Sequence, residues 1–297
     1  MMSSTVVDNI RADAAKIHFL LKELLTESSI HRWHDPNSDG FLYIGGHYAW
    51  DPLTDAGRRI QAEALERYRR LEALFRVLLR EQPSDTLHDF DRHHTEVTDF
   101  LQHQGTLFKD SPKAYFDRAA SALDSELALL KRLYSHTEGQ AIFVPDSNAL
   151  IHNPHLEKWS FADTPQFSLV IVAPVLGELD VLKVNHRVET VRDKAEKVIR
   201  LLKELRRRAQ TSGKKLSDGV VLVSGVSEVV TVATEPQMEN SLPWFDPSNK
   251  DDQILAATIE VMRGNPRSAV LMVSRDINMQ NKCEFAGIPF VEPPDPV

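Results

Sequence analysis

Six short apolar runs, rich in valine and isoleucine, occupy the second half of the chain and constrain its fold most strongly. They are QAIFV, FSLVIVA, GVVLVS, EVVTVAT, SAVLMVS and IPFVE, beginning at residues 140, 167, 219, 228, 268 and 288. Stretches with helical spacing separate several of these runs. Continuous apolar runs that alternate with helices are typical of a parallel sheet covered on both faces. We therefore predict an α/β domain over residues 140–297.

Residues 1–139 show a different pattern, in which apolar residues recur three or four positions apart. Segments of this kind lie at about 8–26, 54–80, 84–101 and 111–134. Such spacing predicts amphipathic helices, and Ser111 followed by Pro112 is typical of a helix start. The sequence therefore predicts an all-α N-terminal domain, to which it assigns no role, joined to the α/β domain near residue 139.

Two of the apolar runs lead directly to an acidic residue. Asp146 follows QAIFV and a single proline, and Asp276 follows Ser274 and Arg275 at the end of SAVLMVS. In an open parallel sheet the ligand site lies beyond the carboxyl ends of the strands. Asp146 has an alternative role as the N-cap of the following helix, because Asp, Ser and Asn are good N-cap residues.

Two further acidic pairs, each placed at the start of a helix, are expected at the same edge of the sheet. Glu178 and Asp180 follow FSLVIVA, and Asp251 and Asp252 precede the apolar stretch ILAAT. Acidic residues in a first helical turn interact favourably with the helix dipole, which is a sufficient explanation for either pair alone. Carboxylates from four elements would repel one another unless a cation neutralised them. An all-oxygen cluster suits Mg²⁺ or Mn²⁺.

Four motifs together resemble the PIN (PilT N-terminal) nuclease family over about residues 140–294. They are VPDSNALI from residue 144, VLGELDVLK from 175, DDQILAAT from 251 and MVSRD from 272. The resemblance implies a catalytic, metal-binding set made of Asp146, Glu178, Asp252 and Asp276. Glu178 would be either a ligand or an orienter of bound water, while Asp251, Asp180 and Ser274 are uncertain members.

The resemblance implies a metal-dependent endoribonuclease that cleaves single-stranded RNA with one or two Mg²⁺ or Mn²⁺ ions. Three alternatives remain open at this point. The chain could be the toxin of a toxin–antitoxin pair, a DNA-directed flap-type nuclease, or a scaffold that binds RNA or protein without cutting. A length of 297 residues argues against the toxin, which is usually little more than the bare domain.

Nucleic-acid binding requires a local basic patch, since the formal net charge of the chain is −8. Between Lys183 and Arg208 there are ten Lys or Arg against four Asp or Glu. The residues expected to contact phosphate are Arg200, Lys203, Arg207 and, beside the acidic site, Arg275. A solvated helix face is the alternative explanation for the basic stretch.

Cysteine content and hydropathy restrict the location of the protein. Cys283 is the single cysteine, which excludes an internal disulfide and a multi-cysteine zinc site. There is no apolar run of the length that a membrane span needs, about 18 residues. A cytoplasmic protein without membrane contact is expected, with the helical domain as the surface for a protein partner or a second copy.

Overall fold

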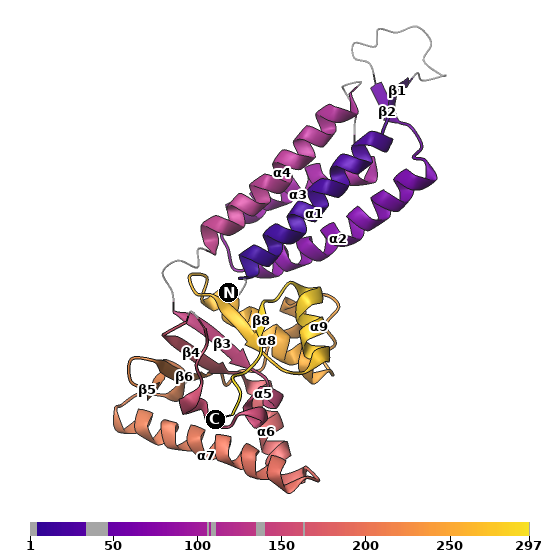
Figure 1. Ribbon diagram of the computed structural model, residues 1–297. Helices are drawn as coiled ribbons and strands as arrows, with labels where there is room; N and C mark the ends of the chain where they lie inside the picture. The colour runs from indigo at the N-terminus through magenta and orange to yellow at the C-terminus, as the bar shows by residue number, and fades with distance from the viewer. Residues whose placement is uncertain are drawn as a thin grey trace. The chain divides into compact units, whose positions relative to one another are not determined.

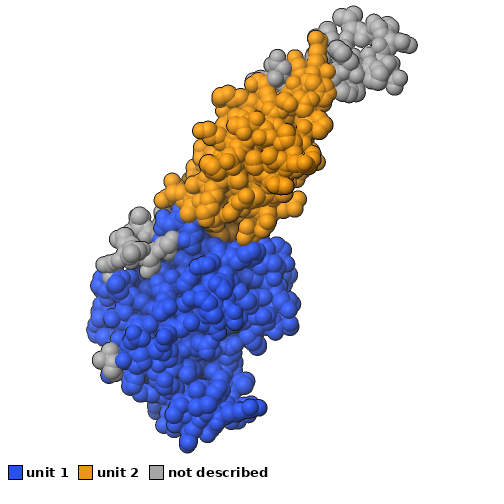
Figure 2. Space-filling model, turned by 45° about the vertical axis from the view of Figure 1, so that its right-hand side comes forward, with its two compact units in different colours: residues 1–9, 133–297 blue, residues 10–132 orange. Residues whose placement is uncertain are grey.

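The computed structural model describes residues 5–33, 47–105, 107, 111–134, 140–162 and 164–296. The chain divides into two compact units (Figure 2). One, the helical unit, is Ile10–Arg132; the other, the C-terminal unit, combines Met1–Asn9 with Leu133–Val297. The domain boundary was predicted directly after residue 139, at the end of the segment 135–139, which lies outside the described residues. The division into two units falls between Arg132 and Leu133.

The first part of the chain is helical, as predicted. Its elements are α1 (Val6–Glu27), β1 (Ile30–Trp33), β2 (His47–Trp50), α2 (Asp55–Leu79), α3 (Ser84–Gln102) and α4 (Pro112–Leu133). The Thr54 side chain caps α2 by accepting a hydrogen bond of 3.0 Å from the Gly57 N–H. Strands β1 and β2 pair antiparallel. The four helices pack through apolar stripes such as Ile10, Ile17 and Leu24 of α1, all fully buried.

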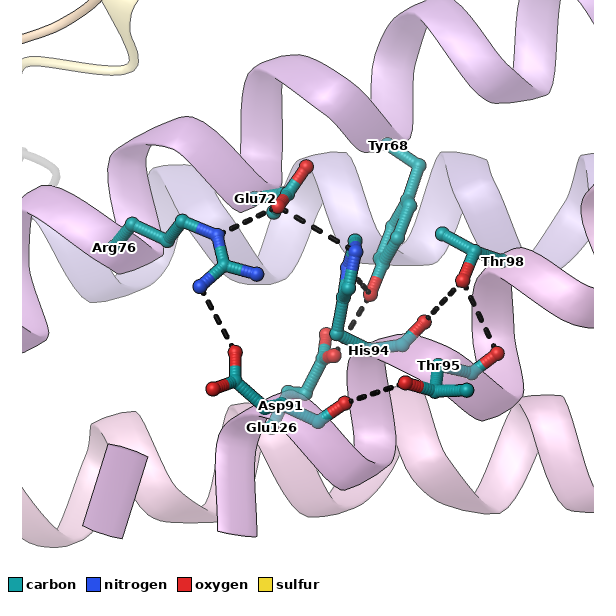
Figure 3. Close-up of polar contacts among 8 residues, drawn as sticks. All are labelled: Tyr68, Glu72, Arg76, Asp91, His94, Thr95, Thr98 and Glu126. Carbon is teal, nitrogen blue, oxygen red and sulfur yellow. Dashed lines mark hydrogen bonds and ion pairs between the residues drawn. The ribbon is translucent and has the colours of Figure 1, made fainter. Parts of the chain in front are cut away.

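A chain of polar contacts crosses the interior of the helical unit (Figure 3). In order, its members are Glu126, Tyr68, His94, Glu72, Arg76 and Asp91. The Tyr68 hydroxyl donates to Oε1 of Glu126 over 2.8 Å. Oε2 of Glu126 is buried and has no hydrogen-bond partner among the described residues. Burial raises the pKa of Glu126 to about 8, so this side chain is protonated at neutral pH.

The C-terminal unit is built on one six-stranded sheet (Figure 1). Its strands are β3 (Ala141–Pro145), β4 (Phe167–Ile171), β5 (Val220–Val223), β6 (Ser227–Thr231), β7 (Val270–Val273) and β8 (Phe290–Val291). They lie in the order β5-β6-β4-β3-β7-β8. All pairs except β5–β6 are parallel. Every residue of β4 and β7 is buried, which explains their continuous apolar sequences.

Helices connect and flank these strands (Figure 1). They are α5 (Ser147–His152), α6 (Ala173–Asn185), α7 (Glu189–Thr211), α8 (Lys250–Gly264), α9 (Ile277–Ala286), and the short 3-10 helices η1 (Leu156–Lys158), η2 (Leu216–Asp218) and η3 (Met238–Asn240). The start of α6 differs from the prediction. Because α6 begins at Ala173, Glu178 and Asp180 lie in its middle and cannot be explained by the charge preference of a first helical turn.

The mostly parallel sheet confirms the predicted α/β fold, and β5 is its one antiparallel strand. Strands β5 and β6 form an antiparallel hairpin at the edge of the sheet. Only residues 224–226 separate them, and Gly225 has a φ of +71°. A parallel connection needs about a dozen residues or more, so this link is long enough only for a hairpin.

The order of the strands defines where a ligand site can form. From β3 the chain proceeds outward to β4 and β6, and then returns to the other side of β3 as β7 and β8. Such a reversal leaves a crevice beyond the carboxyl ends of the two strands at which the order changes. Here those strands are β3 and β7. No helix in the described part of the chain has the length and apolar character needed to cross a membrane.

Candidate acidic site

Asp146 stands at the carboxyl end of β3 and is 3% exposed. Its Oδ1 accepts a hydrogen bond of 2.6 Å from the Ala149 N–H, which caps α5. Burial raises the pKa of Asp146 to about 6, and the negative charges of Glu178 and Asp276 add to the increase. Hydrogen bonds from Ser274 and Ala149 act in the opposite direction. Asp146 is therefore both a helix cap and a member of a group of interacting carboxylates.

Ser274 joins the ends of β3 and β7. Its hydroxyl is fully buried and donates to Oδ2 of Asp146 over 2.5 Å. The Oγ atom of Ser274 in turn accepts a hydrogen bond of 3.0 Å from the Asp276 N–H. Asp276 caps α9 through the Asn278 N–H, and its Oδ2 accepts a hydrogen bond of 3.3 Å from Asn148. The crevice between β3 and β7 thus holds Asp146 and Asp276, fixed by two polar neighbours.

Glu178 faces the same edge from α6. Burial raises its pKa, and the charge of Asp251 adds to the increase, whereas a hydrogen bond from Ser147 and the charge of Lys250 act against it. Glu178 therefore lies within electrostatic range of carboxylates from both β3 and α8. Of the two acidic residues that begin α8, Asp251 is the one whose charge raises the pKa of Glu178.

Asp252 is the more deeply buried of the two, at 8% exposed. Its Oδ2 accepts a hydrogen bond of 2.9 Å from the Asp246 N–H, and its Oδ1 lies 2.8 Å from Nζ of Lys282. Lys282, on α9, also lies 3.3 Å from Oδ2 of Asp251. Burial lowers the pKa of Lys282, but the two carboxylates outweigh this effect and leave it above the usual value. Lys282 thus neutralises the beginning of α8.

The donor set fits a hard divalent cation. All the side chains that meet here offer oxygen, and two of the carboxyl groups, Asp146 and Glu178, have raised pKa values because of burial and neighbouring negative charge. A bound cation would offset both the cost of burying these charges and the repulsion between them. Among the described residues, however, no three His, Cys, Asp or Glu side chains are already arranged to share one ion. Ser274 and Ala149 each donate to one oxygen of Asp146. At the start of α8, Lys282 contacts one oxygen of Asp251 and one of Asp252, and the Asp246 N–H donates to the other oxygen of Asp252.

The basic segment forms α7, whose buried stripe agrees with the sequence prediction. The buried residues are Ala195, Val198, Leu202, Leu205 and Ala209. The predicted phosphate contacts Arg200, Lys203 and Arg207 are all exposed. Arg200 is paired with Glu196 over 2.6 Å, whereas Lys203 and Arg207 form no ion pair with any described residue. The basic face is therefore available to an anion, with Lys203 and Arg207 the least compensated of the three.

The remaining two candidate residues have partners other than the four proposed carboxylates. Arg275 is exposed, and its Nη1 donates to the His152 ring, 2.8 Å from Nδ1. Asp180 is exposed on α6 and pairs with Lys183. Asp180 lines a hollow beside α7.

Sequence reasoning missed three residues that hold the site together. Asn148 supports Asp276, Ser147 hydrogen-bonds to Glu178, and Lys282 pairs with both acidic residues of α8. Ser147 and Asn148 could have been considered, because they are the first two residues after Asp146 at the end of β3. Lys282 gave no signal, since its partners precede it by about thirty positions and only the tertiary fold brings them together.

A comparison with protein families gives one match: the model of the PIN domain matches residues 143–292, half of the chain. The match begins within β3 and ends just after β8, so it includes part of β3, the other five strands and all the acidic residues described above. The comparison with curated proteins gives no match.

Proposed function

This chain belongs to the PIN domain family, and from that premise we propose that it is a metal-dependent ribonuclease that cuts phosphodiester bonds within single-stranded RNA. PIN domains are generally nucleases. The observation that carries the proposal is the electrostatic coupling of Asp146 to Glu178 and Asp276 at the crevice between β3 and β7. A buried carboxylate surrounded by others is costly unless it has a cationic ligand.

Mg²⁺ or Mn²⁺ is the cofactor that this proposal assigns. The residues that would hold it are Asp146, Glu178, Asp252 and Asp276, with Asp251 as an alternative at α8. When bound, the ion would activate water and stabilise negative charge on the phosphate oxygens. The chain's own polar groups then have positioning roles. Ser274 directs one oxygen of Asp146, and Asn148 directs one oxygen of Asp276.

The basic face of α7 is the proposed contact for the RNA backbone. Phosphate contacts supply most of the non-specific affinity for nucleic acids, and the exposed side chains of Arg200, Lys203 and Arg207 can form them. Arg275, beside Asp276, is a proposed contact nearer the scissile bond. We further propose that residues 1–139 form a separate domain for a protein partner, a second copy or substrate choice, and that the protein acts in the cytoplasm.

A second candidate function has one observation in its favour. The acidic groups at α8 are held by Lys282, and the described residues contain no three groups poised around one ion. This arrangement is compatible with a PIN-type scaffold that binds RNA without cutting it. The two functions differ in a single measurable property, which is metal-dependent cleavage.

The test is incubation of labelled single-stranded RNA and DNA of the same sequence with Mg²⁺, Mn²⁺ or EDTA. The proposal expects RNA to be cut with either metal and not with EDTA, and a circular RNA to be opened, since internal cutting needs no free end. Asp146→Asn should abolish cutting, while Glu284→Gln, an exposed change on α9, serves as the matched control. Binding without cutting would favour the scaffold, and cutting of DNA alone would refute the proposed substrate.

A further inference from the structure

A hollow of about 550 Å³ lies between α6 and α7, at some distance along the sheet edge from the acidic site. We refer to it as the α6–α7 pocket. Its lining comes from α6, α7, the turn that follows α7, and the end of β6 at Thr231. Pockets that hold small ligands typically measure about 300 to 1,000 Å³, so the volume suits one nucleotide.

We call the buried and half-buried Leu and Ile side chains of the lining the apolar floor, and its exposed Lys and Arg side chains the cationic rim. The floor is formed by Leu176, Ile199, Leu202 and Leu216. The rim carries four exposed cations, Lys203, Arg206, Lys214 and Lys215. None of these four forms an ion pair with any residue that the structure describes, and the single carboxylate of the lining, Asp180, is paired with Lys183. The pocket therefore combines an apolar surface with uncompensated positive charge.

The turn after α7 brings two of these cations to the pocket. Gly213 has a φ of +68°, a left-handed conformation that ends the helix and reverses the chain. Its N–H donates to the Gln210 carbonyl over 3.0 Å, and the Lys214 N–H donates to the Ala209 carbonyl over 2.9 Å. Lys214 and Lys215 follow at once, so their position is set by the geometry of this helix end.

The pocket opens at the same edge of the sheet as the acidic site. Leu176 lies in the first turn of α6, directly after β4, and Thr231 is the last residue of β6. Strands β3, β4 and β6 are adjacent and parallel. Neighbouring strands lie about 4.8 Å apart, so the ends of β3 and β6 are separated by about 10 Å. If the phosphate that is cut lies at the acidic site near Asp146, a neighbouring nucleotide of the same RNA strand can reach the pocket.

We propose that the α6–α7 pocket holds one nucleotide of the RNA strand, with its base against the apolar floor and its phosphates on the cationic rim. This inference rests on the proposed function, because it is the acidic site that fixes the direction of the strand. Free phosphate would leave the floor uncovered, and an apolar peptide would leave the four cations without partners. Gln210 and Ser217 lie at the wall, where they can hydrogen-bond to the edge of a base.

The test is binding of fluorescent single-stranded RNA with non-hydrolysable linkages by the full chain in Mg²⁺, so that the acidic site can hold the strand while cutting is absent. The RNA is made as a set of oligonucleotides, each of which lacks the base at one position, and that position differs from one oligonucleotide to the next. Removal of the base that lies on the apolar floor should weaken binding by about fivefold, because its buried apolar surface is lost. We expect that loss at a single position in a strand of fixed register, and near-equal binding for the other positions.

One double variant tests whether the pocket binds the RNA, and a second double variant is its control. Lys214→Gln with Lys215→Gln should lower the slope of log Kd against log salt by about 1.4, since each lost phosphate contact lowers it by about 0.7. Lys158→Gln with Arg187→Gln removes the same charge from exposed positions outside the lining and is the control. Circular dichroism and the melting temperature verify that each variant is folded.

The outcomes separate this proposal from the proposed function. If wild type cuts RNA but both double variants change the slope equally, the pocket proposal is overturned and the nuclease proposal stands. If Kd rises equally for every missing base, the cationic rim binds only the charge of the RNA backbone, and the pocket proposal is again overturned. Tighter binding of free adenosine monophosphate than of the strand would identify a mononucleotide site instead. A position-specific effect in a protein that cuts nothing supports the pocket and refutes the nuclease proposal.

Discussion

The Ser274 hydroxyl donates a hydrogen bond of 2.5 Å to Oδ2 of Asp146, and this contact joins the carboxyl ends of β7 and β3. Both residues are buried. Because the bond favours the charged form of Asp146, it offsets part of the effect of burial and holds the carboxyl group in one orientation. The following predictions concern this contact and the charges around it.

Ser274→Ala should raise the pKa of Asp146 above about 6 in the metal-free protein. A hydrogen bond to a charged group contributes about 1.5 to 3 kcal/mol, which equals a rise of about 1 to 2 in the pKa. The measurement is a carboxyl ¹³C NMR titration in EDTA. Ser274→Thr retains a hydroxyl group and is the control. An unchanged pKa in the alanine variant would show that the contact does not stabilise the ionised carboxylate.

Glu126→Gln should stabilise the protein at pH 8 and have little effect at pH 4. The folded-state pKa of about 8 lies above the ordinary value of 4.5, so the unfolding free energy of wild type falls as pH rises through this interval. The full difference is about 5 kcal/mol. Denaturant unfolding at several pH values measures it. Glu63→Gln, an exposed change on α2, should leave the pH dependence as it is in wild type.

Local sequence was sufficient to predict the part of the acidic site that follows strand ends. Asp146 and Asp276 were predicted because each comes directly after an apolar run, and the chain direction alone places such residues at one edge of a sheet. The predicted start of α6 was wrong for an equally local reason. Its N-cap is Val172, which makes no side-chain cap, so the helix begins without the polar signal that usually marks a start.

Contacts between distant segments could not be predicted in the same way. Lys282 determines how Asp251 and Asp252 are held, and it belongs to another helix. The antiparallel pairing of β5 follows from the short link to β6, which the apolar pattern of the two runs does not reveal. The network around Glu126 joins three helices, and no single helix shows it. Sequence thus predicted which residues reach the edge, and tertiary contacts decided their orientation.

Lys282→Met should increase the effect of Mn²⁺ on stability. Lys282 now neutralises Asp251 and Asp252, so it competes with any cation that needs these carboxylates. Without it the metal-free protein carries more repulsion, and Mn²⁺ should bind more tightly and raise Tm by a larger amount. Thermal unfolding at constant ionic strength, with and without Mn²⁺, measures both effects. An identical Tm increase in wild type and variant would place the metal away from α8.

Arg207→Gln should weaken RNA binding more than Arg200→Gln, although both residues are exposed on α7. Arg200 is already paired with Glu196, and part of its charge is compensated, whereas Arg207 forms no ion pair with a described residue. A full phosphate contact changes the slope of log Kd against log salt by about 0.7 for a single strand. Fluorescence anisotropy at a series of salt concentrations gives the slopes. Equal slopes in both variants and wild type would mean that this face of α7 binds no RNA.

Asp146→Asn should separate the capping role of this residue from its electrostatic role. Its folded-state pKa of about 6 lies above the ordinary value of 3.8, so the unfolding free energy of the metal-free wild type falls as pH rises across this interval. The change amounts to about 3 kcal/mol. Asparagine also caps helices well, so the variant keeps the cap and removes the charge. At pH 7 without metal it should therefore be more stable than wild type.

Adding Mn²⁺ should reverse the order of the two proteins. A ligand that binds only the folded state stabilises it by about 2.7 kcal/mol at a hundredfold excess over Kd. Wild type should gain this stability, and Asp146→Asn should gain much less, because it lacks a charged oxygen at the crevice between β3 and β7. Glu284→Gln should respond as wild type does. Equal Tm increases in wild type and Asp146→Asn would show that Asp146 is a helix cap alone, and that any metal binds elsewhere.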